Sequence, residues 1–368
     1  MIDFRYHLVS IVAVFLALAI GIVLGSTELQ GPTYNLLNQT TGKLQNEYNQ
    51  ASSQRDIAQQ QADLGENYAQ AVEPVVLHDL LAGQRLLIIT EPGAPASVVT
   101  AISNAATQDA GATVTGQIAL QSKFFDTSDT TLDGLNQINL AMSQADGIVL
   151  STGTTYQQQA AQVIASEILS PASAPPAGQG ATAQPSTQPS TQPSTQPSTS
   201  PSAGSQLETD AQTMLGSYAD AGFLTVSGQP AAPATLAVIV TPQTAPADGL
   251  ADPLDHLLAP LAEELAAKSS ATVVAGVSAD SGPGSPIAAL RASTAASKVS
   301  TVDDADFVAG QSVVIQALAS ELNGGNPGSY GIANGASAVA PSPAPTSSTS
   351  ASPTATASSA DTKKKTKK

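Results

Sequence analysis

The chain has no cysteine and no tryptophan, and aromatic residues make up only 4% of its 368 positions. Without cysteine there is no disulfide, no thiolate metal site and no cysteine nucleophile. With so few aromatic side chains, a core has to be built from Val, Ile, Leu and Ala, which favours compact layers of helix and sheet. Basic residues are scarce as well, since the chain before the last six positions contains 8 basic and 29 acidic residues. Such a body should repel nucleic acid, because phosphate binding is driven by clustered Lys and Arg.

The other five basic residues all lie in the last six positions, within the ending KKKTKK. This lysine cluster is suited to docking on anionic envelope polymers or lipid headgroups, and the alternative is a solubilising end. The cluster closes a Ser, Thr, Pro and Ala tail over 336–368, and four tandem QPST units lie in a similar stretch over 170–206. Neither segment carries enough apolar surface to offset its chain entropy, so both are predicted to be disordered.

An uncharged apolar run lies close to the N-terminus, from Leu8 through Phe15 and Gly21 to Leu24. As a helix it is roughly 25 Å long, which is enough to span a bilayer with help from its flanks. Arg5 and the free amine precede the run, whereas the first basic residue after it is Lys43. By the positive-inside rule, residues 1–7 are a cytoplasmic end, residues 8–26 a transmembrane anchor, and the bulk of the chain is extracytoplasmic.

The alternative for this segment is a signal peptide cleaved before Ser26, since Val23 and Gly25 are small enough for a cleavage site. An uncleaved anchor fits the residues better. The apolar run is longer than a usual signal-peptide core, and the segment before it carries Asp3, Phe4 and Tyr6 rather than several lysines. Both alternatives export the remainder of the chain.

Residues 31–74 predict a helical stalk, rich in Gln, Ala, Asn and Glu, without proline from Tyr34 to Glu73 and closed by Pro74. Steps of four and three residues connect a possible coiled-coil seam made of Leu37, Thr41, Leu44, Tyr48, Ala51, Arg55, Ala58, Ala62, Gly65, Ala69 and Val72. This spacing favours a homodimer through the stalk. Thr, Arg and Gly are weak seam residues, so a solvated single helix remains the alternative.

The remainder predicts an α/β domain over 84–169 and 207–332 with a doubly wound, mostly parallel, Rossmann-like sheet. Its strands are expected where short apolar runs occur, at 85–90, 112–120, 146–151, 236–241, 271–277 and 298–302. Most of these runs are continuously apolar, as in strands buried on both faces. Helix-length segments separate them, at 96–110, 131–143, 155–169, 253–268 and 307–322.

Nothing in the sequence has the pattern of a catalytic or cofactor site, and we expect the protein not to be an enzyme. There is no GxGxxG after a strand, no P-loop and no GxSxG elbow. His7, His78 and His256 are far apart and lack the paired spacing of a metal site. The loops 91–93 and 151–153 follow predicted strands, where doubly wound sheets usually bind ligands, although tight turns explain these residues without a ligand.

Three segments carry a resemblance to a known family: the opening MIDFRYHLVSIVAVFLALAIGIVLGS, the stretch STVDDADFVAGQSVVIQALASELNGG and the following GSYGIANGA. They closely resemble the actinobacterial MctB-type copper transporter family. The motif residues are Asp3, Phe4, Arg5, Tyr6, His7, Asp303, Asp304, Gly310, Gln311, Tyr330 and Gly331.

This resemblance implies a cell-membrane, single-pass envelope protein in copper homeostasis or export, with copper as the only implied ligand. A related branch of the family implies an alternative, in which a dimeric coiled-coil scaffold binds a membrane partner and regulates peptidoglycan assembly. The sequence itself argues against an autonomous pore. A membrane barrel needs many strands of alternating polarity, and one helix cannot line a channel.

Overall fold

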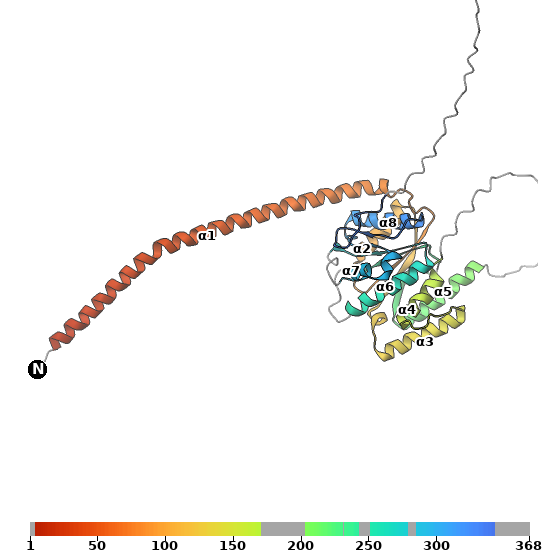
Figure 1. The fold of residues 1–368 in the computed structure, drawn as a ribbon, viewed down its shortest axis with the longest axis horizontal. Helices are drawn as coiled ribbons and strands as arrows, with labels where there is room; N and C mark the ends of the chain where they lie inside the picture. Colours follow the sequence, from red (N-terminus) through yellow and green to blue (C-terminus); the bar gives the residue numbers. More distant parts are fainter. Residues whose placement is uncertain (1–3, 171–202, 231, 243–250, 279–284, 343–368) are drawn as a thin grey trace, which may run out of the picture. The chain divides into compact units, whose positions relative to one another are not determined.

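The computed structural model describes residues 4–170, 203–230, 232–242, 251–278 and 285–342. The predicted disordered segments therefore lie almost entirely outside the described residues. The chain forms two compact units, residues 1–68 and 69–368. The first unit consists of most of one helix, and the second, which we call the head, contains a seven-stranded sheet and its helices (Figure 1).

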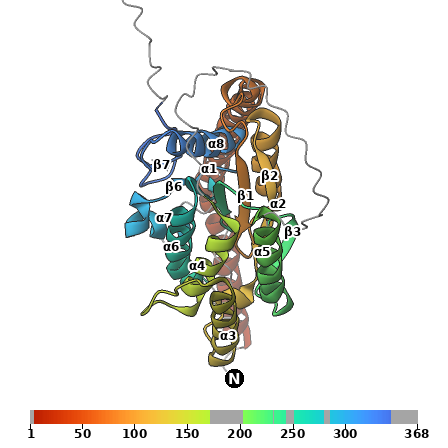
Figure 2. The ribbon, with the colours of Figure 1, turned by 90° about the vertical axis from the view of Figure 1, so that its right-hand side faces the viewer.

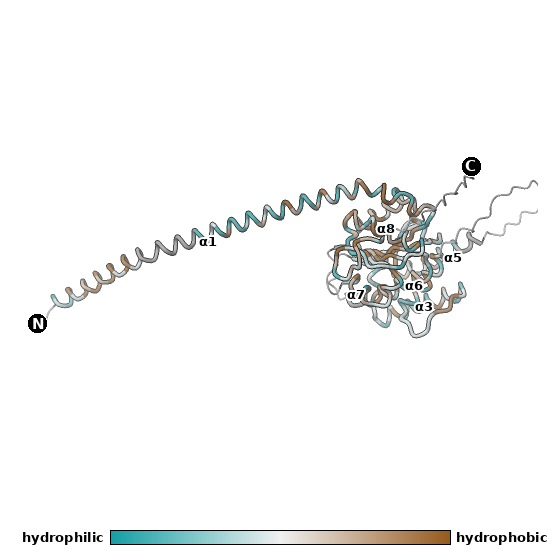
Figure 3. The backbone as a smooth tube through the Cα atoms, turned by 45° about the horizontal axis from the view of Figure 1, so that its top comes forward, coloured by the Kyte–Doolittle hydropathy of each residue, from teal (hydrophilic) through white to brown (hydrophobic). Residues whose placement is uncertain are grey.

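Helix α1 runs without interruption over Phe4–Val76, 73 residues. Its stretch Arg5–Gly25 has a mean hydropathy of 2.9 and is, among the described residues, the one helical segment long and apolar enough to cross a membrane. Figure 3 shows this stretch in brown and a largely hydrophilic stretch after it. The sequence predicted an anchor and a stalk that ends at Pro74. The two segments are instead one helix that continues past Pro74, and whether it pairs with a second helix stays a prediction.

The head is built on a sheet with the strand order β3-β2-β1-β4-β5-β6-β7. All neighbouring strands are parallel except β2 and β3, which are antiparallel. The strands are β1 Arg85–Thr90, β2 Thr113–Leu120, β3 Leu224–Gly228, β4 Leu236–Val240, β5 Ala271–Ala275, β6 Ser300–Val302 and β7 Ser329–Tyr330. The predicted mixed α/β fold with a mostly parallel sheet is confirmed.

Helices cover both faces of this sheet (Figures 1 and 2). Because successive strand residues point to opposite faces, Leu86 and Ile88 of β1 pack into one core while Leu87 and Ile89 pack into the other. The first core also contains side chains of α2 Ala96–Asn104 and α8 Val308–Leu322, and the second contains side chains of α4 Tyr156–Ile168, α5 Ala203–Asp220, α6 Ala251–Lys268 and α7 Pro286–Ala292. Strands β1, β4 and β5 are buried on both sides, which explains their continuous apolar runs.

One predicted strand is wrong. Residues 146–151 do not form a strand, because α3, Asp129–Asp146, ends there with Gly147 in a left-handed conformation (φ 68°). The apolar residues that follow lie in a loop, in which the Gln162 side chain of α4 hydrogen-bonds Val149 O and Ser151 N. Val149 is 86% exposed, unlike a residue in the middle of a buried strand.

Two strands and two α-helices among the described residues of the head were not predicted: β3, β7, α5 and α7. β3 is an edge strand with a mostly exposed burial pattern, and β7 has only two residues, so neither produces a continuous apolar run. Helix α5 begins at Ala203, inside the segment that was predicted to be disordered up to Gln206.

Candidate functional site

The motif residues of the second half of the chain meet at the carboxyl ends of strands β6 and β7. Asp303 and Asp304 follow β6 directly, Gly310 and Gln311 lie in the first turns of α8, and Tyr330 closes β7. All of these residues are buried, and so is Gly331, which directly follows Tyr330. Because carboxyl ends of parallel strands share one edge of a sheet, residues almost thirty positions apart come together here. We call this group the carboxyl-edge cluster.

An ion pair between Arg291 and Asp303 forms the centre of the carboxyl-edge cluster. Arg291 Nη1 lies 2.7 Å from Asp303 Oδ2, and the two side chains are 7% and 0% exposed. The Arg291 guanidinium also donates to Thr301 Oγ1 at 2.9 Å and to the carbonyl oxygen of Tyr330 at 2.7 Å. One cation on α7 therefore links β6 to the end of β7.

Asp303 holds the loop that follows β7. Its Oδ1 accepts hydrogen bonds from the backbone N–H groups of Ile332 at 2.9 Å and Ala333 at 3.1 Å. With the arginine and two amides as donors, this buried carboxylate has the partners that a buried charge requires. The arrangement fixes the conformation of residues 331–333.

Glycine is required at two positions around the pair. Gly331 has φ +121°, and a Cβ atom there would collide with the carboxylate of Asp303. A Cβ atom on Gly310 would collide with the carbonyl oxygen of Asp304, because α8 passes close to the end of β6. Both motif glycines are therefore explained by close approach to the two motif aspartates.

Asp304 differs from its neighbours because one oxygen atom of its buried carboxyl group has no hydrogen-bond partner among the described residues. The residue is 5% exposed, and the atom is Oδ1. Burial, followed by the charge of Asp303, raises the pKa of Asp304 to about 6. Asp306, in contrast, accepts hydrogen bonds from the backbone N–H and the hydroxyl of Ser278, at 2.8 and 2.6 Å.

A second, partly buried carboxylate lies at the amino ends of β5 and β6. Glu321 of α8 accepts a hydrogen bond from the N–H of Thr272 at 3.2 Å and another from the Ser300 hydroxyl. Burial raises the pKa of Glu321 to about 7, although these hydrogen bonds act in the opposite direction. The C-terminal end of α8 is thus attached to β5 and β6 through Glu321.

The described residues contain no group of three or more His, Cys, Asp or Glu side chains arranged to hold a metal ion. His78 is exposed and lies 3.2 Å from Asp79, while His7 lies on α1 in the other unit and the side chain of His256 falls outside the described residues. Soft thiolate and thioether clusters, which favour Cu(I), are missing from the sequence as well. A lone buried carboxylate such as Asp304 is not a copper site.

Of the two loops considered as ligand sites, only one lies where it was predicted. Residues 91–93 follow β1 at the point where the strand order reverses between β1 and β4, and Glu91 is buried. Residues 151–153 do not follow a strand, so that prediction is wrong. They precede α4, and Ser151 O accepts a hydrogen bond from Gln159 Nε2 of that helix at 3.2 Å.

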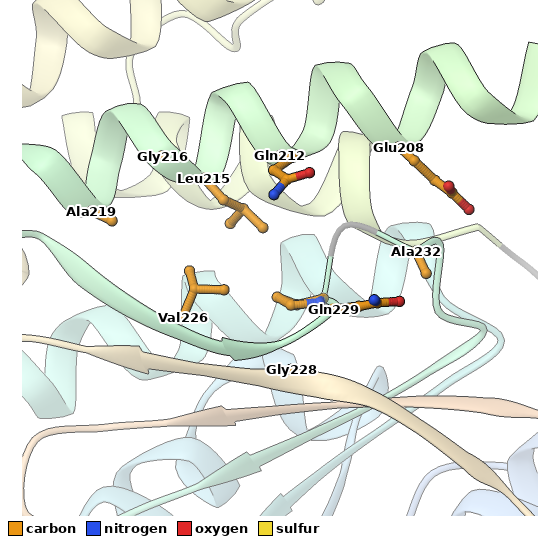
Figure 4. Close-up of a pocket in the computed structure, with 10 residues that line it drawn as sticks. Glu208, Gln212, Leu215, Gly216, Ala219, Val226, Gly228, Gln229 and Ala232 are labelled. Atoms are coloured by element: carbon orange, nitrogen blue, oxygen red, sulfur yellow. The ribbon is translucent and has the colours of Figure 1, made fainter. Parts of the chain in front are cut away.

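A hollow of about 390 Å³ lies between α5 and β3, at the other end of the sheet from the carboxyl-edge cluster. Figure 4 shows Val226 pointing from β3 toward Leu215 and Ala219 of α5, with Glu208 and Gln229 farther along. Its lining is apolar with one carboxylate and two amide side chains. None of its residues was singled out in the sequence.

The remaining predicted site residues lie on α1. Phe4, Arg5, Tyr6 and His7 form its first turns, and Asp3 lies outside the described residues. Leu8, Phe15 and Leu24 are each more than half exposed, and Gly21 lies between them in the apolar stretch. On the predicted seam, Leu44, Tyr48, Ala51 and Ala58 are exposed and Val72 is half-buried, while the side chain of Leu37 is outside the described residues.

Sequence reasoning missed Arg291, which is the partner that explains Asp303. A signal was present, because Arg291 is the one charged residue in the apolar pattern PIAALRA of α7. A lone arginine in such a pattern needs a buried partner, and the adjoining acidic run offered three. Glu321 also carried a signal, because an acidic side chain in the last turn of a helix is unfavourable next to the negative end of the helix dipole unless it has partners.

The fold and the apolar start of α1 define a class: an α/β head that follows a single helix suited to crossing a membrane. Within that class, the chain belongs to the MctB family, whose model is described as copper transport outer membrane protein and matches residues 1–341. The family predicted by resemblance is thereby confirmed.

Individual relatives agree with this assignment. The copper transporter MctB of Mycobacterium tuberculosis (strain ATCC 25618 / H37Rv) is 29% identical over 342 residues, which cover 92% of this chain and 99% of the relative. The copper transporter MctB of Mycobacterium leprae (strain TN) is 27% identical over 349 residues, with the same two coverages. The similarity therefore includes both units of the chain.

Proposed function

We propose that this chain is a non-catalytic, membrane-anchored envelope protein that takes part in copper transport or copper homeostasis. The observation that carries the proposal is the family match over residues 1–341, with relatives named copper transporters aligned over 99% of their own length. A match of this extent includes the apolar stretch of α1 as well as the head. We infer that anchor and head act together.

The proposed topology places the N-terminus in the cytoplasm and the head on the other side of the cell membrane. The position of Arg5 before the apolar stretch, with Lys43 as the next basic residue, supports this orientation. One apolar helix cannot line a conduction path by itself. The proposed role is therefore to handle or deliver copper in the envelope, or to transport it together with further chains.

The carboxyl-edge cluster supports this role structurally rather than as a copper site. Its one ion pair is satisfied within the protein, and the described residues offer no set of three metal ligands. We assign to it the task of fixing the loop after β7, which carries Ile332 with 65% of its side chain exposed. Copper ligands are not assigned to any described residue.

The test is total copper in a deletion strain during a copper challenge. We expect the strain to hold more copper than the parent and to grow less well, and the full chain to restore both. A chain that starts at Gly31 and is exported by a cleavable signal should not restore them, because it lacks the anchor. Normal copper content and normal tolerance in the deletion strain would contradict the proposal.

A second candidate is a scaffold that self-associates through α1 and binds a membrane partner in cell-envelope assembly. The observation that favours it is the length of α1, whose 73 residues extend well beyond the 21 of the apolar stretch. A scaffold needs such a spacer, whereas copper binding does not. Under this candidate the deletion strain has altered cell-wall turnover and unchanged copper.

A further inference from the structure

The second half of the stalk carries two apolar stripes instead of one seam. Ile57, Leu64 and Tyr68 follow each other at steps of seven and four residues and are 52%, 70% and 71% exposed. Ala58, Ala62 and Gly65 of the predicted seam follow at steps of four and three and are exposed as well. At about 100° of rotation per residue, the large stripe and the small stripe lie about 100° apart on α1.

The single predicted seam does not explain the large stripe. Positions 57, 64 and 68 fall beside that seam, where a two-stranded coiled coil would leave these three large side chains largely in water. The opposite face of the helix is polar, with Asp56, Gln59 and Asp63. Gln61 lies between the two stripes, so the apolar residues form two separate faces that one partner helix would not cover together.

Gly65 is a second feature that the single chain does not explain. It lies in the middle of a helix, where glycine costs roughly 0.5–1 kcal/mol relative to alanine. Among the described residues no atom lies within 4 Å of the place where its Cβ would be, so the chain itself leaves room for a side chain. A neighbouring helix that approaches closely would require the glycine.

The occupant that fits is a second copy of this chain. All copies begin with the same apolar stretch in the same membrane, so their α1 helices run parallel and residues of similar number lie at similar height. At equal height, Ile57 and Leu64 of one copy stand level with Ala58 and Gly65 of the next. Large side chains would fill the spaces left by small ones, as knobs fill holes.

Charges on the outer sides of the two stripes are complementary in this arrangement. Arg55 lies beside the small stripe, and Asp56 lies about 100° from the centre of the large stripe, toward the polar face. In the single chain these two exposed side chains pair with each other at 3.0 Å. When the large stripe of one copy packs on the small stripe of the next, Asp56 of the first copy approaches Arg55 of the second.

We propose that residues 55–68 form a head-to-tail contact between parallel copies, in which the large stripe of each copy packs on the small stripe of its neighbour. Such a heterologous contact uses two different surfaces and closes only with three or more copies. It deepens the scaffold candidate above by naming the partner and the contact. It does not depend on copper.

The test uses disulfide crosslinking in membranes. Every crosslink between copies has to involve an introduced cysteine, because the chain has none of its own. In the first experiment, Leu64→Cys and Ala62→Cys are carried by two differently tagged copies that are expressed together. In the second experiment, both substitutions are in the same chain. We expect crosslinks between the two tags, and a ladder of trimers and larger species from the double variant. Each single variant should stay mostly uncrosslinked.

A double variant on the polar face, Gln59→Cys with Asp63→Cys, is the matched control and should give no ladder. Gly65→Leu added to the Leu64→Cys and Ala62→Cys chain should remove the ladder, whereas Gln59→Leu should keep it. Dimers from Ala62→Cys alone would show the symmetric seam and overturn the proposal, and so would the lack of any crosslink. Because no result depends on copper content, failure here is separable from failure of the copper role.

Discussion

At the scale of single residues, the buried pair of Arg291 and Asp303 determines how the last strands and their loops are held. The pair is almost fully removed from water, and each partner is bound by further groups of β6 and of the loop after β7. Replacing both residues of such a buried ion pair by apolar residues can preserve stability. Replacing only one of them is strongly destabilising, because the other charge is then buried without a partner.

Replacing Arg291 by Met should therefore destabilise the head by about 3–5 kcal/mol, the range for breaking a buried ion pair. Urea unfolding of the full chain in detergent, followed by tyrosine fluorescence, measures the change. Arg85→Met is the matched control, since Arg85 is exposed, and should change stability little. The double variant Arg291→Met with Asp303→Leu should recover part of the loss. If Arg291→Met and Arg85→Met behave alike, the pair does not have the proposed role.

Glu321 should make the stability of the head depend on pH. Its pKa is raised to about 7 in the folded chain by burial, so between about pH 4.5 and 7 the folded state binds a proton that the unfolded state has released. Stability should be highest at the low end of this window and fall by on the order of 3 kcal/mol as pH rises through it.

Unfolding midpoints measured from pH 4.5 to 8 for Glu321→Gln test this origin of the pH dependence. The variant should show a flatter profile than the parent across the window. Glu208→Gln, on an exposed helical position, should keep the parental slope. A parental slope in Glu321→Gln would mean that other groups cause the dependence.

At the scale of elements, the sequence predicted those parts whose patterns are local. Runs such as 85–90 and 236–241 are apolar throughout because β1 and β4 are central strands with helices on both faces. Strands β3 and β7 escaped prediction because four of the five residues of β3 are exposed and β7 has only two residues. The wrong strand at 146–151 is a helix end with an apolar loop, which periodicity alone cannot distinguish from a short strand.

In the carboxyl-edge cluster, too, the sequence predicted the residues with a recognisable local motif but not the contacts between distant residues. Asp303, Asp304 and the two motif glycines were found by resemblance, and their positions around one ion pair required the fold. The Arg291–Asp303 contact joins residues 12 positions apart on different elements, and the Arg291–Tyr330 contact joins residues 39 positions apart. No local spacing rule predicts such contacts.

Glycines in two helices offer a prediction at this scale, because one is packed closely against a neighbouring element and the other is not. Gly310→Ala should prevent α8 from packing against the end of β6, since its Cβ would collide with Asp304 O, and should cost several kcal/mol of stability. Gly134→Ala in α3, where no described atom lies within 4 Å of the new Cβ, should instead stabilise by about 0.5–1 kcal/mol. Thermal unfolding of both variants measures the contrast. Equal effects would contradict the packing described for α8.

At the scale of the whole molecule, the account depends on a chain that is anchored once and exported. The apolar stretch Arg5–Gly25, the family membership over residues 1–341 and the acidic body are all consistent with this arrangement. The copper role, the scaffold role and the contact between stalks each require the head to be outside the cytoplasm. None of them requires a catalytic centre.

The most direct test of this central claim is cysteine labelling of intact cells with a membrane-impermeant maleimide, followed by the intact mass of the purified chain. Gln137→Cys, on an exposed position of α3, should be labelled in intact cells, and Ile2→Cys only after the membrane is permeabilised. The mass should include residues 1–25. Labelling of Gln137→Cys only after permeabilisation, or a mature chain that begins at Ser26, would contradict the account.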